Sequence, residues 1–238
     1  MDAQLKFGGI TMDVLFKDIK NVHLSVYPPY GRVHISAPLH MNINTIRSFA
    51  ISKLNWIRQQ QKKISEQERE TPREYLERES HYVWGNRYLL EMIESNTAPS
   101  IELRHNTMLL HVRNKDDFAR KQAVIEEWYR IQLRRSAYSL IAKWEPILGV
   151  KIEKIFVQKM KTKWGGCNPA EKHIRLNTDL AKKPPECLEY VIVHEMIHLL
   201  EPTHNARFTA LVEQFIPKWL FYREQLNRLP VSHAEWDY

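Results

Sequence analysis

The chain has 238 residues, of which 43% are hydrophobic and 26% are charged, a balance typical of a globular protein that buries a core. Its formal net charge is +7 at pH 7, and its only cysteines are Cys167 and Cys187, which excludes a disulfide framework. No stretch has the apolar length of a signal peptide or a membrane span. We therefore expect a cytoplasmic protein that does not enter the membrane.

The first forty residues predict a β-rich start to the chain. Apolar and polar side chains alternate there, and three strands are predicted at 10–16, 22–26 and 32–36. An amphipathic helix follows, with Asn42 or Asn44 as its N-cap. Residues 59–80 are strongly polar and predict an exposed helix end or a connector.

The middle of the chain predicts more strands and then the longest helix. Residues 82–93 are expected to be extended, and residues 101–104 and 108–112 are predicted to form a β-hairpin across a short turn. A helix is predicted from residue 116 to about residue 145, and Pro146 followed by Gly149 is expected to end it. We therefore expect residues 1–114 to form an N-terminal β-rich region with one helix, and residues 115–238 to form a second domain that the long helix leads.

The positive charge is concentrated between residues 115 and 163, where Lys and Arg are about twice as numerous as Asp and Glu. Such a surplus is compatible with nucleic-acid binding. A solvated face of the long helix explains it more simply, so nucleic acid is kept only as a minor alternative partner.

The last hundred residues alternate short extended segments with helices. A strand is predicted over 152–160, a basic, aromatic loop over 161–168 and a short strand over 173–177. Two prolines and Glu186 then begin a helix, and Asn205 is suited to cap a later one.

The sequence His194-Glu195-x-x-His198, followed by His204, is the motif that says most about function. On an α-helix, residues four apart share a face, so His194 and His198 can point at one ion with Glu195 beside them. Two imidazoles, a third ligand and a position left to water form a catalytic zinc site. His204 is the natural third ligand, because residues 201–203 break the helix and can turn the chain back. The pattern predicts one zinc ion per chain, with Glu195 as the general base for a metal-activated water.

The residues around the motif predict that its helix is buried. Nearly every flanking side chain between Leu188 and Leu200 is apolar. A buried helix carries two imidazoles and a carboxylate only where something compensates their desolvation. A bound metal does so, and we favour it over histidines satisfied by local hydrogen bonds.

Further segments accompany this motif: Met160-x-x-x-Trp164-Gly165-x-Cys167-Asn168, Ile174-x-Leu176-Asn177 and Phe208. Together they resemble the YgjP-like family of HExxH metallopeptidases, which are zincins related to SprT-like and minimal gluzincin-type domains. The resemblance is most specific over residues 152–219. It implies an α+β fold with a C-terminal zincin-like core, in which a small sheet and a backing helix surround the HExxH helix. It also implies that the zinc ligands are His194, His198 and His204 and that the catalytic glutamate is Glu195.

The sequence differs at several positions from the motifs of known zincin classes, and these differences show which class it resembles. Metzincins have a glycine where this chain has Glu201, and no Met-turn follows, so that class is excluded. The family's usual Met-x-x-Arg-Trp-Gly-Ser-Cys pattern has Lys163 and Gly166 at its Arg and Ser positions, which weakens bidentate anion binding and removes a hydroxyl. In gluzincins the third ligand is a glutamate on the next helix, so Glu213 remains an alternative to His204.

We expect a zinc-dependent hydrolase, and a YgjP-like metallopeptidase is the leading hypothesis. The strand 173–177 is expected to align a peptide by acting as an edge strand. Substrate contacts are expected from Lys161, Lys163, Trp164, Arg175 and Asn177. The resemblance also implies an alternative, a UTP pyrophosphatase. In that case Lys159, Lys161, Lys163 and Arg175, which lie before the motif helix, would neutralise the phosphates of a nucleoside triphosphate. A third hypothesis is a metal-stabilised module that binds nucleic acid or protein.

Overall fold

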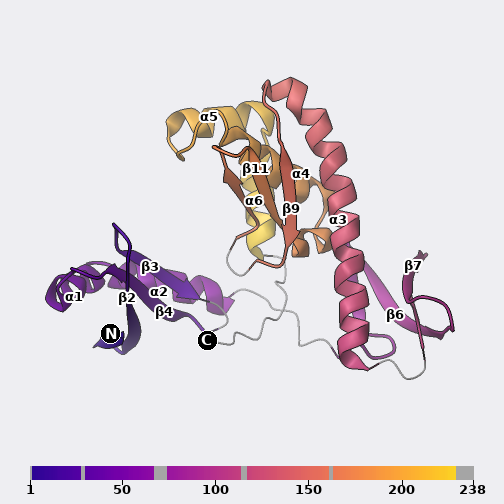
Figure 1. Ribbon diagram of the computed structural model, residues 1–238, viewed down its shortest axis with the longest axis horizontal. Coiled ribbons are helices and arrows are strands. Elements are labelled where there is room, and N and C mark those ends of the chain that lie inside the picture. Colours follow the sequence, from indigo (N-terminus) through magenta and orange to yellow (C-terminus); the bar gives the residue numbers. More distant parts are fainter. Residues whose placement is uncertain (1, 28–29, 67–73, 114–116, 161–162, 229–238) are drawn as a thin grey trace. The chain divides into compact units, whose positions relative to one another are not determined.

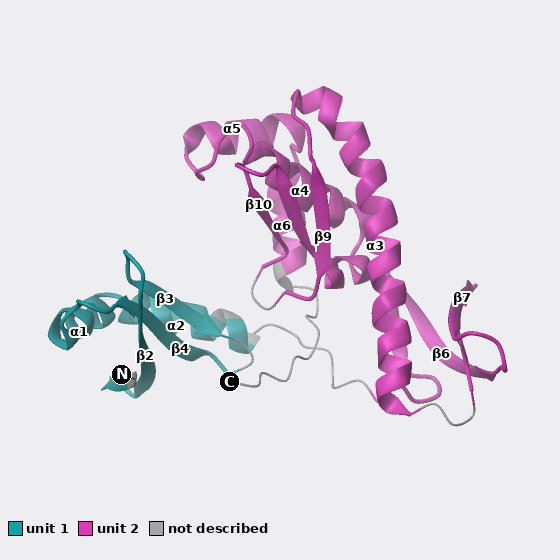
Figure 2. Cartoon of the chain, in the orientation of Figure 1, with its two compact units in different colours: residues 1–70, 233–238 teal, residues 71–232 magenta. Residues whose placement is uncertain are grey.

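The computed structural model describes residues 2–27, 30–66, 74–113, 117–160 and 163–228 (Figure 1). These residues form two compact units, one that contains the described residues up to 66 and one that begins at residue 74 (Figure 2). The division therefore lies earlier in the chain than the boundary expected at residue 114. The reason is that residues 80–112 share one hydrophobic core with the helices and strands that follow them.

The first unit is a four-stranded sheet with two helices: β1 (Asp2–Phe7), β2 (Ile10–Lys17), β3 (His23–Tyr27), β4 (Arg32–Pro38), α1 (Ile43–Ser52) and α2 (Leu54–Glu66). The strand order is β1-β2-β4-β3, with β2 and β4 parallel. Inward side chains such as Met12 and Ile35 pack with Ile46 and Ile57 of the helices. The three predicted strands are confirmed, whereas β1 was not predicted and the predicted helix divides at Lys53.

The second unit begins with a separate sheet: β5 (Ser80–Val83), β6 (Asn86–Glu94), β7 (Ser100–Arg104) and β8 (Thr107–Val112). Its strand order is β5-β6-β8-β7, and β7 with β8 forms the predicted antiparallel hairpin. Leu90, Met108 and Leu110 of this sheet belong to the main core of the unit.

The long helix α3 (Phe118–Leu148) packs against β7, β9 and α4 (Figure 1). It begins where the side chain of Asp117 accepts a hydrogen bond from the backbone N–H of Arg120, as an N-cap does. The predicted stop at Gly149 is confirmed, whereas Pro146 does not end this helix. Pro146 lies inside the last turn, and the helix ends at Gly149, which has a φ of 65° and the left-handed conformation that glycine favours.

A three-stranded sheet then leads to the histidine motif: β9 (Lys154–Gln158), β10 (Gly165–Asn168) and β11 (His173–Asn177). Its order is β10-β11-β9, with β11 antiparallel to β10 and parallel to β9. Two expectations are corrected here. Residues 165–168 are a strand rather than a loop, and β11 is the central strand, so it cannot act as an edge for a peptide.

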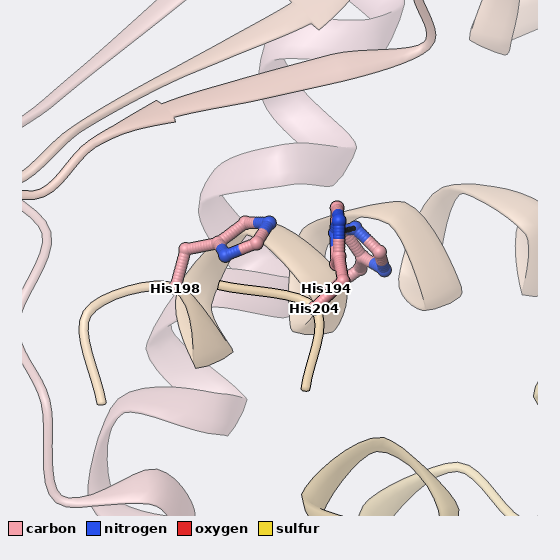
Figure 3. Close-up of side chains that lie close together, drawn as sticks. All are labelled: His194, His198 and His204. Carbon is pink, nitrogen blue, oxygen red and sulfur yellow. Dashed lines mark hydrogen bonds between the residues drawn. The ribbon is translucent and has the colours of Figure 1, made fainter. Parts of the chain in front are cut away.

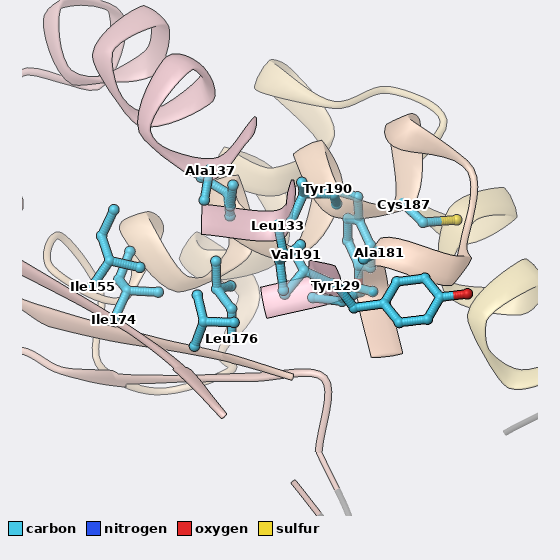
Figure 4. Packing of buried hydrophobic residues seen from close by; sticks show 14 of the residues in the cluster. Tyr129, Leu133, Ala137, Ile155, Ile174, Leu176, Ala181, Cys187, Tyr190 and Val191 are labelled. Carbon is cyan, nitrogen blue, oxygen red and sulfur yellow. The ribbon is translucent and has the colours of Figure 1, made fainter. Parts of the chain in front are cut away.

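Four helical elements complete the unit: η1 (Thr178–Lys182), α4 (Pro185–Ile197), α5 (Ala206–Phe215) and α6 (Trp219–Arg228). The helix α4 is buried on nearly all sides because α3, α5, α6, β10 and β11 contact it. Figure 4 shows Val191 of α4 packed among Leu133 of α3 and Leu176 of β11. The fold is therefore a mixed α+β arrangement of small sheets and helices. None of the helices in the described ranges is long and apolar enough to cross a membrane.

Candidate metal centre

The backbone around α4 and α5 brings the three predicted histidines together. His194 lies in the last turn of α4, and His198 is its C-cap residue. The chain then turns, and His204 lies directly before Asn205, whose side chain accepts a hydrogen bond from the N–H of Phe208 (3.0 Å) and so begins α5. Because Asn205 is held by this hydrogen bond at the start of α5, the position of the preceding residue, His204, is fixed as well.

The imidazole rings of His194, His198 and His204 converge (Figure 3). One potential ligand nitrogen from each residue lies within 4.8 Å of the other two. The Nε2 atoms of His194 and His204 are 3.1 Å apart. Nitrogens that bind one tetrahedral zinc ion are separated by about 3.3 Å, given Zn–N bonds of about 2.0–2.1 Å. The three side chains therefore fit a divalent metal of this kind.

The environment of the rings also suits metal binding. The Nδ1 atom of His198 is 3.2 Å from the carbonyl oxygen of Glu201, and a bond donated to that oxygen leaves Nε2 of His198 as the ligand atom. The ring of Phe208 lies 4.6–4.9 Å, between centroids, from all three imidazoles. Phe208 is itself buried, so it forms an apolar wall behind the histidines.

Electrostatics keeps the histidines in the form that binds metals. Burial lowers the pKa of His194, and the neighbouring His198, His204 and Arg223 act in the same direction, so that this pKa is about 4. Burial also lowers the pKa of His198, partly opposed by its hydrogen bond to Glu201. A metal binds only neutral imidazole, so at neutral pH no proton has to leave His194 first.

Glu195 lies beside the histidines in a tight, desolvated position. Its side chain is 6% exposed, and burial raises the pKa of its carboxyl group to about 7, partly opposed by the charge of Lys163. The strand β10 covers it at Gly165, where a Cβ atom would lie 2.6 Å from Oε1 of Glu195 and 2.9 Å from Cγ1 of Val191. Only glycine therefore allows β10 to approach the carboxylate this closely. A carboxyl group with a pKa near 7 is suited to exchange protons at neutral pH.

The half-buried Cys167 lies two residues further along β10. Burial, together with the nearby charge of Glu195, raises the pKa of its thiol to about 11. The thiol is therefore protonated at neutral pH and is not among the clustered ligand atoms.

Asn177 was predicted to contact substrate, but the structure buries it and occupies its polar atoms. Its Nδ2 atom donates to the carbonyl oxygens of Met160 (2.9 Å) and Lys163 (3.0 Å). Its backbone N–H donates to the carbonyl of Trp164 (2.9 Å). Asn177 therefore holds the segment before β10 in place.

The other predicted substrate residues have different surroundings. Trp164 is half-buried and packs against the main core, and the Lys183 ammonium lies 5.6 Å from the centroid of its ring. Lys163 is exposed and acts electrostatically on Glu195. Arg175 is also exposed, and its guanidinium carbon lies 5.8 Å from the Phe156 ring centroid. Lys161 lies outside the described residues.

The alternative ligand Glu213 lies on α5 with an exposed side chain, and it is not part of the histidine cluster.

The sequence did not show the close contact of Gly165 with Glu195 or the hydrogen bonds of Asn177. The Trp164-Gly165 pair was noticed only as part of a motif, and nothing in it showed that Gly165 faces the motif helix.

A histidine triad beside a buried carboxylate, in a mixed α+β fold, defines a candidate metal-dependent hydrolase. The family model described as "YgjP-like, metallopeptidase domain" matches residues 20–229 of the chain. The chain therefore belongs to the YgjP-like metallopeptidase family.

Two solved structures are distantly similar to this chain. The metallopeptidase zymogen of Pyrococcus abyssi abylysin is 20% identical, with a TM-score of 0.36, over 40% of this chain and 99% of that one. The metallopeptidase zymogen of Methanocaldococcus jannaschii jannalysin is also 20% identical, with a TM-score of 0.35, over 38% of this chain and 87% of that one. A comparison with curated proteins found none that matches.

Proposed function

We propose that this protein is a zinc-dependent peptidase, with His194, His198 and His204 as metal ligands and Glu195 as general base. The observation that carries the proposal is the convergence of three imidazoles beside a buried carboxyl group. Membership of the YgjP-like metallopeptidase family supports it. In this proposal β9–β11, α4 and the backing helix α3 form a zincin-like core.

When bound, the metal would polarise the scissile carbonyl and lower the pKa of a water molecule at the site. Glu195 accepts the proton of the attacking water and passes it to the leaving amine. Its burial favours both steps, because a pKa near 7 allows the same group to accept and to donate a proton. The Phe208 wall and the Gly165 contact hold the reacting groups in fixed positions.

The peptide is proposed to lie along the outer edge of β10. Among the described strands, only β11 pairs with β10, so the other edge has backbone groups for an extended substrate. This edge begins at Gly165, against the carboxyl group of Glu195. The assignment replaces the expected role of β11, whose two edges are both paired.

The described residues do not favour a UTP pyrophosphatase. A phosphohydrolase needs several cations directed at the metal centre. The Nζ atom of Lys159 lies 3.6 Å from Oε1 of Glu126, with which it forms an ion pair. The guanidinium of Arg175 lies over the ring of Phe156 on β9. Of the cations proposed for phosphate that lie in the described ranges, only Lys163 has an electrostatic effect on Glu195. The peptide bond is therefore the proposed electrophile.

The proposal is tested with zinc-loaded full-length protein and a fluorescently labelled, unstructured protein substrate. We expect peptide release that falls at least about a hundredfold in Glu195→Gln, because the general base is lost. The same preparations are incubated with UTP, which should not be hydrolysed. Peptide release that is absent from the wild type, or unchanged in Glu195→Gln, would overturn the proposal. UTP turnover that depends on Glu195 would instead establish the phosphohydrolase.

A further inference from the structure

The sheet formed by β9, β10 and β11 has a second face, which is directed away from α4. Alternate residues of a strand point to opposite faces of its sheet. Ile155, Ile174 and Leu176 are buried in the core that the sheet shares with α3 and α4 (Figure 4). Their neighbours along the strands therefore point to the opposite, outer face, and two of these, Lys154 and Arg175, are exposed. The sheet itself separates this outer face from α4 and its metal ligands.

An aromatic ring and three basic side chains meet on the outer face. The register of β9 and β11 places Lys154 beside His173 and Phe156 beside Arg175. The ring of Phe156 lies at the centre, with Nζ of Lys154 4.9 Å and the guanidinium carbon of Arg175 5.8 Å from its centroid. The ring of His173 lies edge-on to it, at 5.5 Å between centroids. These four residues are called the outer-face cluster below.

The two permanent cations of the outer-face cluster are not neutralised by neighbouring acids. Within the described ranges, no carboxylate lies within ion-pair distance of Lys154 or Arg175. Glu153, which precedes Lys154, is exposed, and Glu171 pairs instead with Nδ1 of His173 at 2.9 Å. The whole chain has a formal net charge of +7. The cluster is therefore expected to attract an anionic ligand.

The surface next to the outer-face cluster has room for a flat ligand. Gly166 of β10 pairs with Arg175, and a Cβ atom at Gly166 would meet no atom within 4 Å. On the other side, Lys154 also lines a hollow of about 200 Å³ between β9 and α3. The walls of this hollow include Ile141 and Tyr138, and the Tyr138 side chain is 57% exposed. A second aromatic ring is thus accessible close to the basic side chains.

We propose that the outer-face cluster binds single-stranded nucleic acid, with a base stacked on Phe156 and phosphates bound by Lys154 and Arg175. Every base has a flat face that stacks on an aromatic ring, and every nucleotide also carries a phosphate. Stacking of a base on an aromatic ring is stronger than an exposed cation–π contact. A base can therefore replace Lys154 over the ring and leave its ammonium group for a phosphate. Tyr138 offers a stacking surface to a further base.

Other anionic partners fit this surface less well. In a duplex the faces of the bases are covered by their neighbours, so Phe156 would have no base to stack on. An acidic protein segment can pair with Lys154 and Arg175, but its carboxylates give the aromatic ring no role. Both would bind through charge alone. The inference does not depend on the proposed peptidase function, because the outer-face cluster and the metal ligands lie on opposite sides of the sheet.

The test measures binding of fluorescently labelled probes to the full-length protein by fluorescence anisotropy. The probes are single strands of RNA and of DNA of about 12 nucleotides, the DNA duplex of the same sequence, and a polyglutamate peptide. Phe156→Leu removes the ring and keeps an apolar side chain, and Phe221→Leu does so at an exposed position of α6. Lys154→Gln and Arg175→Gln each remove one charge, and Arg134→Gln on the exposed face of α3 is their control. Thermal unfolding shows whether each variant remains folded.

The aromatic and the basic residues should affect binding in different ways. We expect Phe156→Leu to weaken binding of the single strands about tenfold without changing its salt dependence, because only stacking is lost. Lys154→Gln and Arg175→Gln should each reduce the slope of log affinity against log salt concentration by about 0.7, because one phosphate contact is lost. Phe221→Leu and Arg134→Gln should bind like the wild type.

The probes also distinguish the possible ligands. Tighter binding of the RNA or of the DNA single strand identifies which nucleic acid is preferred, and either result supports the proposal. Binding of the duplex or of polyglutamate as tight as that of the single strands would overturn it, because charge alone would then explain the surface. Equal affinities of Phe156→Leu and Phe221→Leu for the single strands would overturn it as well. So would the absence of single-strand binding at physiological salt and protein concentrations up to about 100 µM.

Discussion

The Cα of Gly165 faces the carboxylate of Glu195 so closely that a Cβ atom there would lie 2.6 Å from Oε1. The strand β10 therefore touches the proposed general base through a position that has no side chain. This contact joins the proposed substrate edge to the proposed catalytic group. It also explains why a glycine follows Trp164 in a strand, where glycine is otherwise unfavourable.

Gly165→Ala should disturb this contact. We expect a loss of about 1–3 kcal/mol in the free energy of unfolding, because the methyl group must displace Glu195, Val191 or β10 itself. Peptide hydrolysis should fall strongly, since the carboxylate moves from its position beside the ligands. Gly166→Ala is the stability control, because a Cβ there meets no atom within 4 Å. Equal stability of the two variants in chemical denaturation would contradict the described packing.

Asn177→Ala should release the segment that precedes β10. The variant leaves the carbonyl oxygens of Met160 and Lys163 without their Asn177 donor, which predicts a loss of about 1–3 kcal/mol in stability. We also expect faster hydrogen exchange at residues 163–165 and reduced hydrolysis. Gln158→Ala, at an exposed position of β9, provides the comparison. If Asn177→Ala impaired substrate binding with no change in stability or exchange, the residue would be a direct substrate contact instead.

The pKa of Glu195 predicts how the stability of the metal-free protein depends on pH. The folded-state pKa is raised from 4.5 to about 7, so the folded state holds this proton more tightly than the unfolded state does. The stability associated with the protonated form is complete below pH 4.5 and is lost as the pH rises through 7. Glu195→Gln, which cannot ionise, should therefore stabilise the metal-free protein at pH 8 by up to about 3 kcal/mol.

The same substitution should have little effect at pH 4.5, where the carboxyl group is protonated in the folded state. Thermal or urea unfolding of the two metal-free proteins across this range provides the measurement. A difference in stability that does not change between pH 4.5 and 8 would contradict the raised pKa. The burial of His194 acts in the opposite direction, because its lowered pKa removes stability as the pH falls below 6.5. That effect is common to both proteins and cancels in the comparison.

The sequence predicts well the features that depend on local patterns. The apolar flanks of His194 and His198 predicted a buried helix, and α4 is buried. The histidine spacing predicted a cluster, and the three rings converge. Asn205 was identified as a cap from its residue type, and its side chain accepts the expected bond. Each of these follows from chemistry within a few residues of the chain.

The features that were missed depend on contacts between distant residues. The segment Gly165–Asn168 has weak strand propensity, and it is a strand because β11 pairs with it. Strands were predicted at residues 82–93, 101–104 and 108–112, but the sequence did not show that they would share a core with α3. Asn177 had the residue type of a substrate contact, and only the fold shows that its amide holds backbone carbonyls. The spacing of apolar residues predicts which face of a helix or strand is buried, but it does not predict which other element packs against that face.

The most direct test of the central claim is the zinc content and zinc affinity of the wild-type protein, His204→Ala and Glu213→Gln. The three imidazole ligand atoms lie within 4.8 Å of one another, whereas Glu213 is exposed and outside the cluster. We therefore predict one zinc ion per chain in the wild type and in Glu213→Gln, with a loss of at least about a hundredfold in affinity in His204→Ala. Zinc bound by His204→Ala with wild-type affinity, together with its loss from Glu213→Gln, would contradict this metal centre.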